Sequence, residues 1–141
     1  DFDEGKSESV ENNKPILLDF TGWACANCRR VEENTWSEPI VYDMINNEFI
    51  LISLYVDDRS DLNQDQIIIL TDKNGNEKTL KKVGEKWSAF QTINFKINSQ
   101  PYYVLLSPNL EVLNKPIQYT DTDTYQSWLS EGLENFKKNY K

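Results

Sequence analysis

The chain contains two cysteines, Cys25 and Cys28, separated by two residues in the stretch DFTGWACANC. Two sulfurs at this spacing suit a structural disulfide, part of a metal site, or a redox pair. A disulfide that closes so short a loop adds little stability, because that stabilisation grows with loop length. A closed zinc site needs four nitrogen or sulfur ligands, but the chain has no histidine and no third cysteine, so we expect no metal. A redox pair is favoured, and two small buried hydrophobes remain an alternative that does not explain the spacing.

The position of the pair predicts how each sulfur is used. Cys25 follows a predicted strand-to-helix transition, and Cys28 lies one helical turn later, so the two sulfurs can reach disulfide geometry. The first turn of a helix has unpaired N–H groups, which lower a thiol pKa from about 8.5 toward 7 or below. We expect Cys25 to be the exposed attacking thiol and Cys28 the resolving thiol.

Strands and helices alternate around the pair. Residues 16–20 form a short apolar run typical of a buried strand, and residues 49–58 are the longest apolar stretch and predict a central strand. Two helices are expected between these strands. Ser37 is the predicted N-cap of the second helix, with Pro39 in its first turn.

The second half of the chain predicts a hairpin, two helices and two further strands. Asn74-Gly75 indicates a two-residue hairpin turn, and residues 102–106 form another apolar strand with a shorter one near 111–113. One helix is indicated by Trp87, Phe90, Ile93 and Ile97, and a C-terminal one, capped near Asp121 to Asp123, by Tyr125, Leu129, Leu133, Phe136 and Tyr140.

Size and charge bound the function. At 141 residues the chain predicts one domain at residues 15–141, preceded by a flexible acidic tail or linker at residues 1–14. The net charge of −8 disfavours nucleic acid and anionic membrane surfaces as partners. No apolar run is long enough for a membrane span, so we expect no direct membrane insertion. The chain lacks an initiator methionine, so we expect that an export signal or membrane anchor was lost with a missing upstream part.

The strand, aspartate and cysteine pattern resembles thioredoxin. In ILLDF followed by C-x-x-C, Asp19 lies six residues before Cys25, as the buried aspartate of that family does. The resemblance implies that Asp19 accepts a proton from Cys28 during exchange. It also implies a thioredoxin fold, with three α/β/α layers and a mixed central sheet. A β-hairpin and helix around residues 59–98 are then an insertion into that fold.

The longer run DFTGWACANCRRVEENTWSEPIV is similar to the C-terminal thioredoxin-like domain of the DsbD thiol:disulfide interchange proteins. Glu32, seven positions past Cys25, matches an acidic residue of that family and is expected to couple to the cysteine pKa values. Ala26 and Asn27 replace the Gly-Pro of thioredoxin. Together with Trp23, they are expected to contact the partner.

A proline late in the chain completes the resemblance. Pro101 directly precedes the strand at residues 102–106, which is where the family has a cis-proline. A cis bond there exposes the backbone of Gln100 to pair with the partner like an added strand. Tyr102 is expected in the core rather than at the rim of the site.

The resemblance implies a reductase of disulfides in extracytoplasmic proteins. The expected protein is a monomer in the periplasm or cell envelope, tethered to the inner membrane through upstream segments. A membrane thiol electron donor is expected to re-reduce the pair, and no bound cofactor is needed because Cys25 and Cys28 carry the electrons. The alternatives are a freestanding thioredoxin, a cytochrome c maturation reductase, or a redox-inert peptide-binding module.

Overall fold

A mixed three-stranded sheet forms the centre of the molecule, which is seen here in a computed structural model describing residues 1–139. The strand order is β2–β1–β5. β1 (Ile16–Thr21) runs parallel to β2 (Ile50–Tyr55) and antiparallel to β5 (Tyr102–Leu106). These three strands were predicted, but the prediction that the second is central is wrong. β1 is the central strand, and β2 has one edge without a strand neighbour among residues 1–139.

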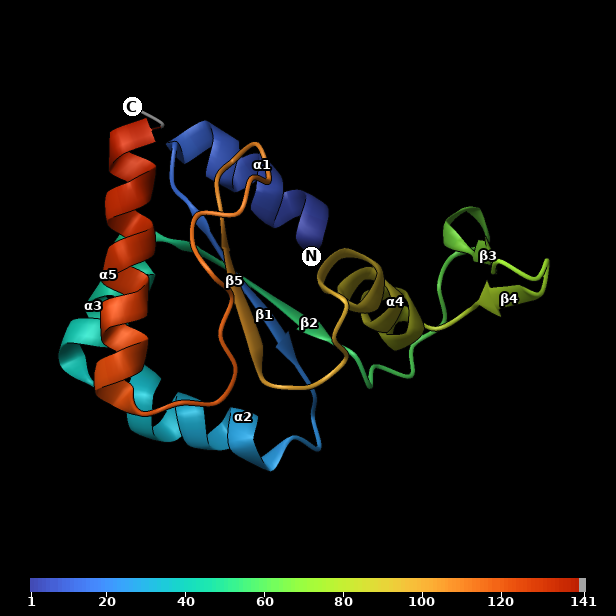
Figure 1. The fold of residues 1–141 in the computed structure, drawn as a ribbon, viewed down its shortest axis with the longest axis horizontal. Coiled ribbons are helices and arrows are strands. Elements are labelled where there is room, and N and C mark those ends of the chain that lie inside the picture. The colour runs from blue at the N-terminus through green and yellow to red at the C-terminus, as the bar shows by residue number, and fades with distance from the viewer. Residues whose placement is uncertain (140–141) are drawn as a thin grey trace.

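Helices cover both faces of this sheet, as the three-layer prediction requires (Figure 1). One face packs against α1 and α4, and the other packs against α2, α3 and α5. A π-helical segment, Glu32–Trp36, continues α2. The helix bounds are α1 Phe2–Asn12, α2 Ala26–Val31, α3 Pro39–Glu48, α4 Val83–Phe95 and α5 Thr122–Asn139. None of the helices within residues 1–139 is both long and apolar enough to cross a bilayer.

The two faces of β1 contribute to two separate hydrophobic clusters. Side chains alternate along a strand, so Ile16, Leu18 and Phe20 point one way and Leu17 and Asp19 point the other. The first set joins a cluster with α1 and α4, which we call the α4 face. The second set lies under α2, α3 and α5, which we call the α2 face.

The N-terminal segment corrects the prediction of a flexible tail at residues 1–14. Phe2–Asn12 is a helix, and its small residues Gly5 and Ser9 are buried. At Gly5 an added Cβ would lie 2.6 Å from the side chain of Ile52, so the helix touches the sheet there. The sequence hides this contact because the helix approaches through small residues rather than through an apolar stripe.

The predicted hairpin forms a small arm that projects from the body (Figure 1). β3 (Ile68–Thr71) pairs with β4 (Glu77–Leu80) in a two-stranded sheet separate from the central one. The predicted two-residue turn is wrong, because five residues, 72–76, join the paired ends of the strands. Gly75 has φ of 82°, and the Asp72 carboxylate accepts backbone N–H bonds within the loop.

Other element ends differ slightly from the prediction. Glu38, rather than Ser37, is the N-cap of α3, and the Ser37 hydroxyl donates back to the Glu33 carbonyl. The short strand near 111–113 is reduced to an isolated bridge between Leu106 and Val112.

The C-terminal helix is confirmed over residues 122–139. The Asp121 carboxylate caps it by accepting the Thr124 N–H at 2.8 Å. Tyr140, which was predicted to extend its apolar stripe, lies outside the described residues.

Candidate active site

The two cysteines lie at the start of α2, as predicted. Cys25 is the N-cap residue and Cys28 is in the first turn. They are joined by a disulfide, with 5.3 Å between their Cα atoms. The Cys28 backbone N–H donates to Cys25 Sγ at 3.1 Å. The helix start therefore supplies a hydrogen bond to the sulfur predicted to become the thiolate.

The two sulfurs differ in their access to solvent. Cys28 is 1% exposed, whereas Cys25 is partly exposed. Cys25 lies in an open hollow of about 400 Å³ whose lining includes Gly22, Ala24, Ala26, Asn27, Val56, Asp57 and Gln100. A partner sulfur can therefore approach Cys25 from this hollow, while Cys28 stays behind it.

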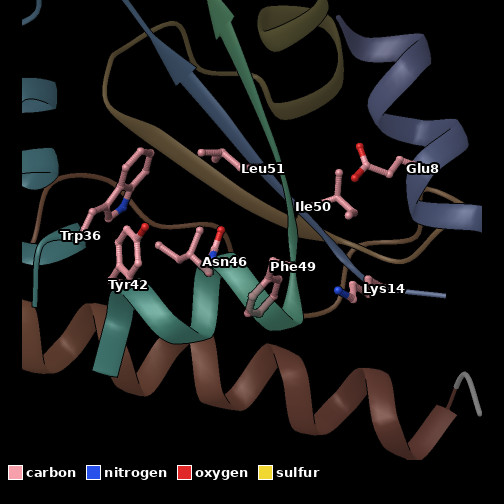
Figure 2. A pocket seen from close by; sticks show the side chains of 9 residues that line it. Glu8, Lys14, Trp36, Tyr42, Asn46, Phe49, Ile50 and Leu51 are labelled. Atoms are coloured by element: carbon pink, nitrogen blue, oxygen red, sulfur yellow. The ribbon is translucent and has the colours of Figure 1, made fainter. Parts of the chain in front are cut away.

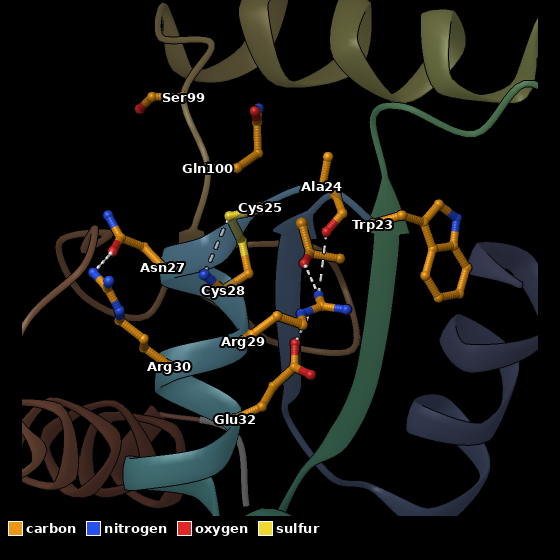
Figure 3. The surroundings of a disulfide bond; sticks show 12 residues. Trp23, Ala24, Cys25, Asn27, Cys28, Arg29, Arg30, Glu32, Ser99 and Gln100 are labelled. Carbon is orange, nitrogen blue, oxygen red and sulfur yellow. Dashed lines mark hydrogen bonds and ion pairs between the residues drawn. A yellow bond between two sulfur atoms is a disulfide. The ribbon is translucent and has the colours of Figure 1, made fainter.

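The loop before β5 forms one wall of this hollow. The Gln100–Pro101 peptide bond is cis, as predicted, and Pro101 is buried. Figure 3 shows Gln100 beside Cys25, between the disulfide and α4. The structure therefore brings together the cysteine pair and the cis-proline loop, which are more than 70 residues apart in sequence.

The residues between the cysteines line the same hollow. Ala26 is exposed, and the Asn27 Oδ1 accepts a hydrogen bond from Arg30 Nη1 at 3.0 Å. The structure therefore places both residues beside Cys25 in the hollow.

Asp19 is buried in the middle of β1, on the α2 face. It is 2% exposed, and its Oδ2 accepts a hydrogen bond from Ser53 Oγ at 3.0 Å. The pKa of Asp19 is raised to about 7, mainly by burial and to a smaller extent by the Glu32 charge, while the Ser53 hydrogen bond and the Arg29 charge oppose this rise. A carboxyl group with such a pKa can take up or release a proton near neutral pH.

Glu32 and Arg29 form an ion pair on the same helical unit. Their side chains meet at 2.9 Å, and each is about one-third exposed. Arg29 Nη2 also donates to Thr21 Oγ1 at 3.1 Å and to the Gly22 carbonyl at 3.2 Å. Arg29 therefore ties α2 to the end of β1, directly before the cysteine loop (Figure 3).

Asp57 is a site residue that the sequence analysis missed. Its carboxylate accepts the backbone N–H of Trp23 at 2.9 Å and of Ala24 at 3.1 Å. Burial alone would raise the pKa of Asp57, but these hydrogen bonds hold it below its ordinary value. Asp57 also lines the hollow, so its carboxylate fixes the turn before Cys25 at the edge of the site. The only sequence signal for it was an acidic pair after an apolar strand.

The two aromatic residues near the site have different positions. Trp23 is 64% exposed, and its ring stacks on Tyr55 with 4.0 Å between ring centroids. In Figure 3 it points away from the disulfide, across β2, so it flanks the hollow rather than covering the sulfurs. Tyr102 is buried against Phe20 and Phe95, which confirms the core position expected for it.

A second hollow, of about 390 Å³, lies away from this chemistry. It is open at the outer edge of β2, between α1 and α3, where Glu8, Trp36 and Tyr42 are among its lining residues (Figure 2). Neither cysteine lines it, and we do not assign it to the active site.

Comparison with known proteins identifies the family. A family model described as thioredoxin-like matches residues 1–82, which is more than half of the chain. The chain belongs to the thioredoxin-like family. The match begins at residue 1, so it includes the segment predicted to be a tail.

One curated relative of this thioredoxin-like chain is the thiol:disulfide interchange protein DsbD of Campylobacter jejuni. The two are 40% identical over 67 residues, which cover 47% of this chain. The chain spans only 11% of the length of that relative.

Solved structures share the fold along most of the chain. The structure named DsbH oxidoreductase has a TM-score of 0.65 at 14% identity, covering 94% of this chain and 81% of its own. A thioredoxin-fold protein from Helicobacter pylori has a TM-score of 0.63 at 20% identity, covering 92% and 75%. The reduced DsbD C-terminal domain of Neisseria meningitidis has a TM-score of 0.58 at 12% identity, covering 93% of both chains. The predicted thioredoxin fold is therefore confirmed.

Proposed function

We propose that this thioredoxin-like chain is a protein-disulfide reductase that acts on extracytoplasmic partner proteins. The observation that carries the proposal is the arrangement of the pair. Cys25 is reachable from an open hollow, whereas Cys28 is buried directly behind it. This asymmetry suits an attacking sulfur and a resolving sulfur, and it would serve no purpose in a structural staple.

The proposed reaction is a two-step exchange of disulfide bonds. In the first step, the Cys25 thiolate attacks one sulfur of the partner disulfide, and the other partner sulfur leaves as a thiolate and takes a proton. In the second step, Cys28 loses its proton and attacks Cys25 Sγ, which releases the second partner sulfur as a thiolate. Two electrons pass to the partner, and its two thiolates take up two protons, one from solvent and one in place of the proton that Cys28 gave up. This chain ends with the Cys25–Cys28 disulfide.

We assign the proton of Cys28 to Asp19 in the second step. The pKa of about 7 supports this role, because the carboxyl group can accept a proton and later release it at neutral pH. Glu32 raises the pKa of Asp19 through its charge and so acts on the reaction through Asp19 rather than by contact.

The partner is proposed to bind along the hollow beside Cys25 as an extended segment. The backbone of Gln100, next to the cis bond, would pair with it in the manner of an added strand. Ala26 and Asn27 would contact it from the helix start, and Trp23 would flank it with an exposed ring.

The similarity to DsbD supports the cellular part of the proposal. We place the protein in the periplasm or cell envelope, and a membrane thiol donor would return two electrons to the Cys25–Cys28 disulfide. No cofactor is assigned, because the sulfurs themselves carry the electrons.

An insulin-reduction assay tests the proposal. Wild-type protein should accelerate insulin reduction by dithiothreitol, and Cys25→Ser should abolish the acceleration. Cys28→Ser should instead accumulate a mixed disulfide with insulin, because the resolving step is lost. Wild-type turnover no better than that of Cys25→Ser would favour a redox-inert peptide-binding module.

A second measurement tests the direction of electron flow. In equilibrium with glutathione, a smaller fraction of this pair should be in the dithiol form than is found for a strongly oxidising disulfide-forming enzyme. Such a low reduction potential is expected of a reductase. An equilibrium as oxidising as that of dedicated disulfide-forming enzymes would contradict the reductase assignment and leave the exchange chemistry standing.

A further inference from the structure

A fully buried glutamine lies outside the residues assigned so far. Gln91, on α4, is 0% exposed, although the apolar spacing of this helix predicts Ile93 as an inward residue. Ile93 is instead 53% exposed. A buried amide side chain is costly unless both of its ends are hydrogen-bonded, so its partners indicate why it is there.

Both ends of the Gln91 amide bond to the cis-proline loop. Its Nε2 donates to the Ser99 carbonyl at 2.9 Å, and its Oε1 accepts from Gln100 Nε2 at 3.0 Å. The orientation of the amide is determined by chemistry, because a carbonyl can only accept. Gln91 therefore holds both the backbone and a side chain of the wall that faces Cys25.

A second set of hydrogen bonds returns from this wall to α4. Gln100 Nε2 also donates to Asn98 Oδ1 at 3.1 Å, and Asn98 Nδ2 donates to Ser88 Oγ at 2.9 Å. Ser88 lies on α4, so the loop is joined to the helix at two points. Such a closed network limits the positions that Gln100 can adopt.

The same helix also contacts the segment at residues 56–58, which contributes to the lining of the hollow. The Gly84 N–H donates to the Asp58 carbonyl at 2.9 Å, and an added Cβ at Gly84 would lie 2.5 Å from the Val56 carbonyl oxygen. Val56 and Asp57 line the same hollow as Gln100. Gly84 and Gln91 are two helical turns apart, about 10 Å along one face of α4.

We propose that Gln91 is a positioning residue for partner binding. α4 rests against the Val56–Asp58 wall at Gly84, and Gln91 fixes the Ser99–Gln100 wall two turns later. The helix thereby sets the gap through which an extended peptide segment carrying a disulfide reaches Cys25. This inference rests on the proposed disulfide exchange and assigns a role to the helix of the 59–98 segment.

The substitution Gln91→Met tests the role, because it keeps the length of the side chain and removes both hydrogen bonds. The KM for insulin should rise at least fivefold while kcat stays within twofold of wild type. The equilibrium constant of the Cys25–Cys28 pair with glutathione should also stay within twofold, because the sulfurs are untouched. Asn94→Ala is the matched control, since Asn94 is an exposed amide of α4 whose side chain, within residues 1–139, bonds only to the Phe90 carbonyl of its own helix, and its KM should equal that of wild type.

Folding of each variant is checked by circular dichroism. If Gln91→Met does not fold, Asn98→Ala replaces it, because Asn98 is exposed and links Gln100 to α4. Asn98→Ala should raise KM about twofold, and an unchanged KM would overturn the inference.

The outcomes separate this inference from the proposed function. A folded Gln91→Met protein with wild-type KM, in an assay where wild type is active, overturns the positioning role alone. If kcat and the equilibrium constant of the Cys25–Cys28 pair with glutathione both fell in Gln91→Met, Gln91 would act on the sulfur chemistry. That result would also overturn the positioning role. A wild-type protein without turnover overturns the proposed function, and the inference fails with it.

Discussion

The two faces of β1 differ in what they bury. Leu18 and its neighbours on the α4 face pack in an apolar cluster with α1 and α4. One residue later, on the α2 face, Asp19 is buried under the helix that carries the cysteines. Adjacent residues of one strand therefore have opposite effects on stability. Leu18 stabilises the fold, whereas Asp19 is a buried proton-binding group that destabilises it.

The cost at Asp19 follows from its pKa. The carboxyl group has a pKa of about 7 in the folded protein, against its ordinary pKa of 3.8 in the unfolded chain. The folded protein therefore binds the proton more tightly. As a result, the free energy of unfolding falls as the pH rises from 3.8 through about 7 and changes little above that.

The largest expected effect lies on the α4 face. Leu18→Ala should lower the free energy of unfolding by about 2–5 kcal/mol, because it leaves a cavity in a fully buried cluster. Denaturant unfolding measures the loss, and insulin turnover by the folded fraction should remain, since Leu18 points away from α2. A loss of turnover in fully folded protein would show that the two faces are not separate in function.

A substitution at the next residue, Asp19, should change the free energy of unfolding in the opposite direction. Asp19→Asn should raise the free energy of unfolding at pH 8 by up to about 4 kcal/mol, because the pKa difference of about three units disappears. The fall in stability between pH 4 and 8 should flatten, and resolution of the mixed disulfide should slow. Denaturant titrations across this pH range check the first point, and an unchanged pH profile would contradict the assigned pKa.

A smaller effect is expected where α1 meets the α4 face. Gly5→Ala should lower the free energy of unfolding by about 1–3 kcal/mol, because the new methyl group would overlap the Ile52 side chain. Exposed Glu11→Ala on the same helix is the control and should change stability little. Equal stabilities for the two variants would mean that the helix does not pack as described.

The smallest expected effect on stability comes from removing the charge of Glu32, which acts on Asp19. Glu32→Gln should lower the pKa of Asp19, because the Glu32 charge helps to raise it. Loss of the partly exposed Arg29–Glu32 pair should cost less than about 1 kcal/mol of stability. The carboxyl carbon of Asp19, followed by NMR, reports the pKa directly, with exposed Glu33→Gln as the control. An Asp19 midpoint that stays fixed or rises in Glu32→Gln would contradict the coupling.

Much of the site could be predicted because its parts are local or have a strong pattern. The cysteine spacing, the apolar run around Asp19 and the proline before the last strand each have a short signal in the sequence. The thioredoxin resemblance then related these distant segments to one another. The structure confirms that Gln100–Pro101 is cis and that Cys25 begins a helix.

The missed features depend on contacts that leave no local pattern. Asp57 is one more acidic residue after a strand until its carboxylate meets the N–H groups of the cysteine loop. Gln91 breaks the apolar period of α4 because its partners come from a loop rather than from the core. The sequence of helix α1 suggests a polar tail, because the small residues Gly5 and Ser9, rather than apolar ones, make its contact with the sheet.

The β3–β4 arm has a practical consequence. Its tip, at residues 72–76, projects away from the sheet and from the start of α2 (Figure 1). A fluorophore attached at Lys73 would thus report on tumbling and on complex formation without occupying the hollow beside Cys25. Because Lys73 is exposed, such a label needs no rearrangement of the interior.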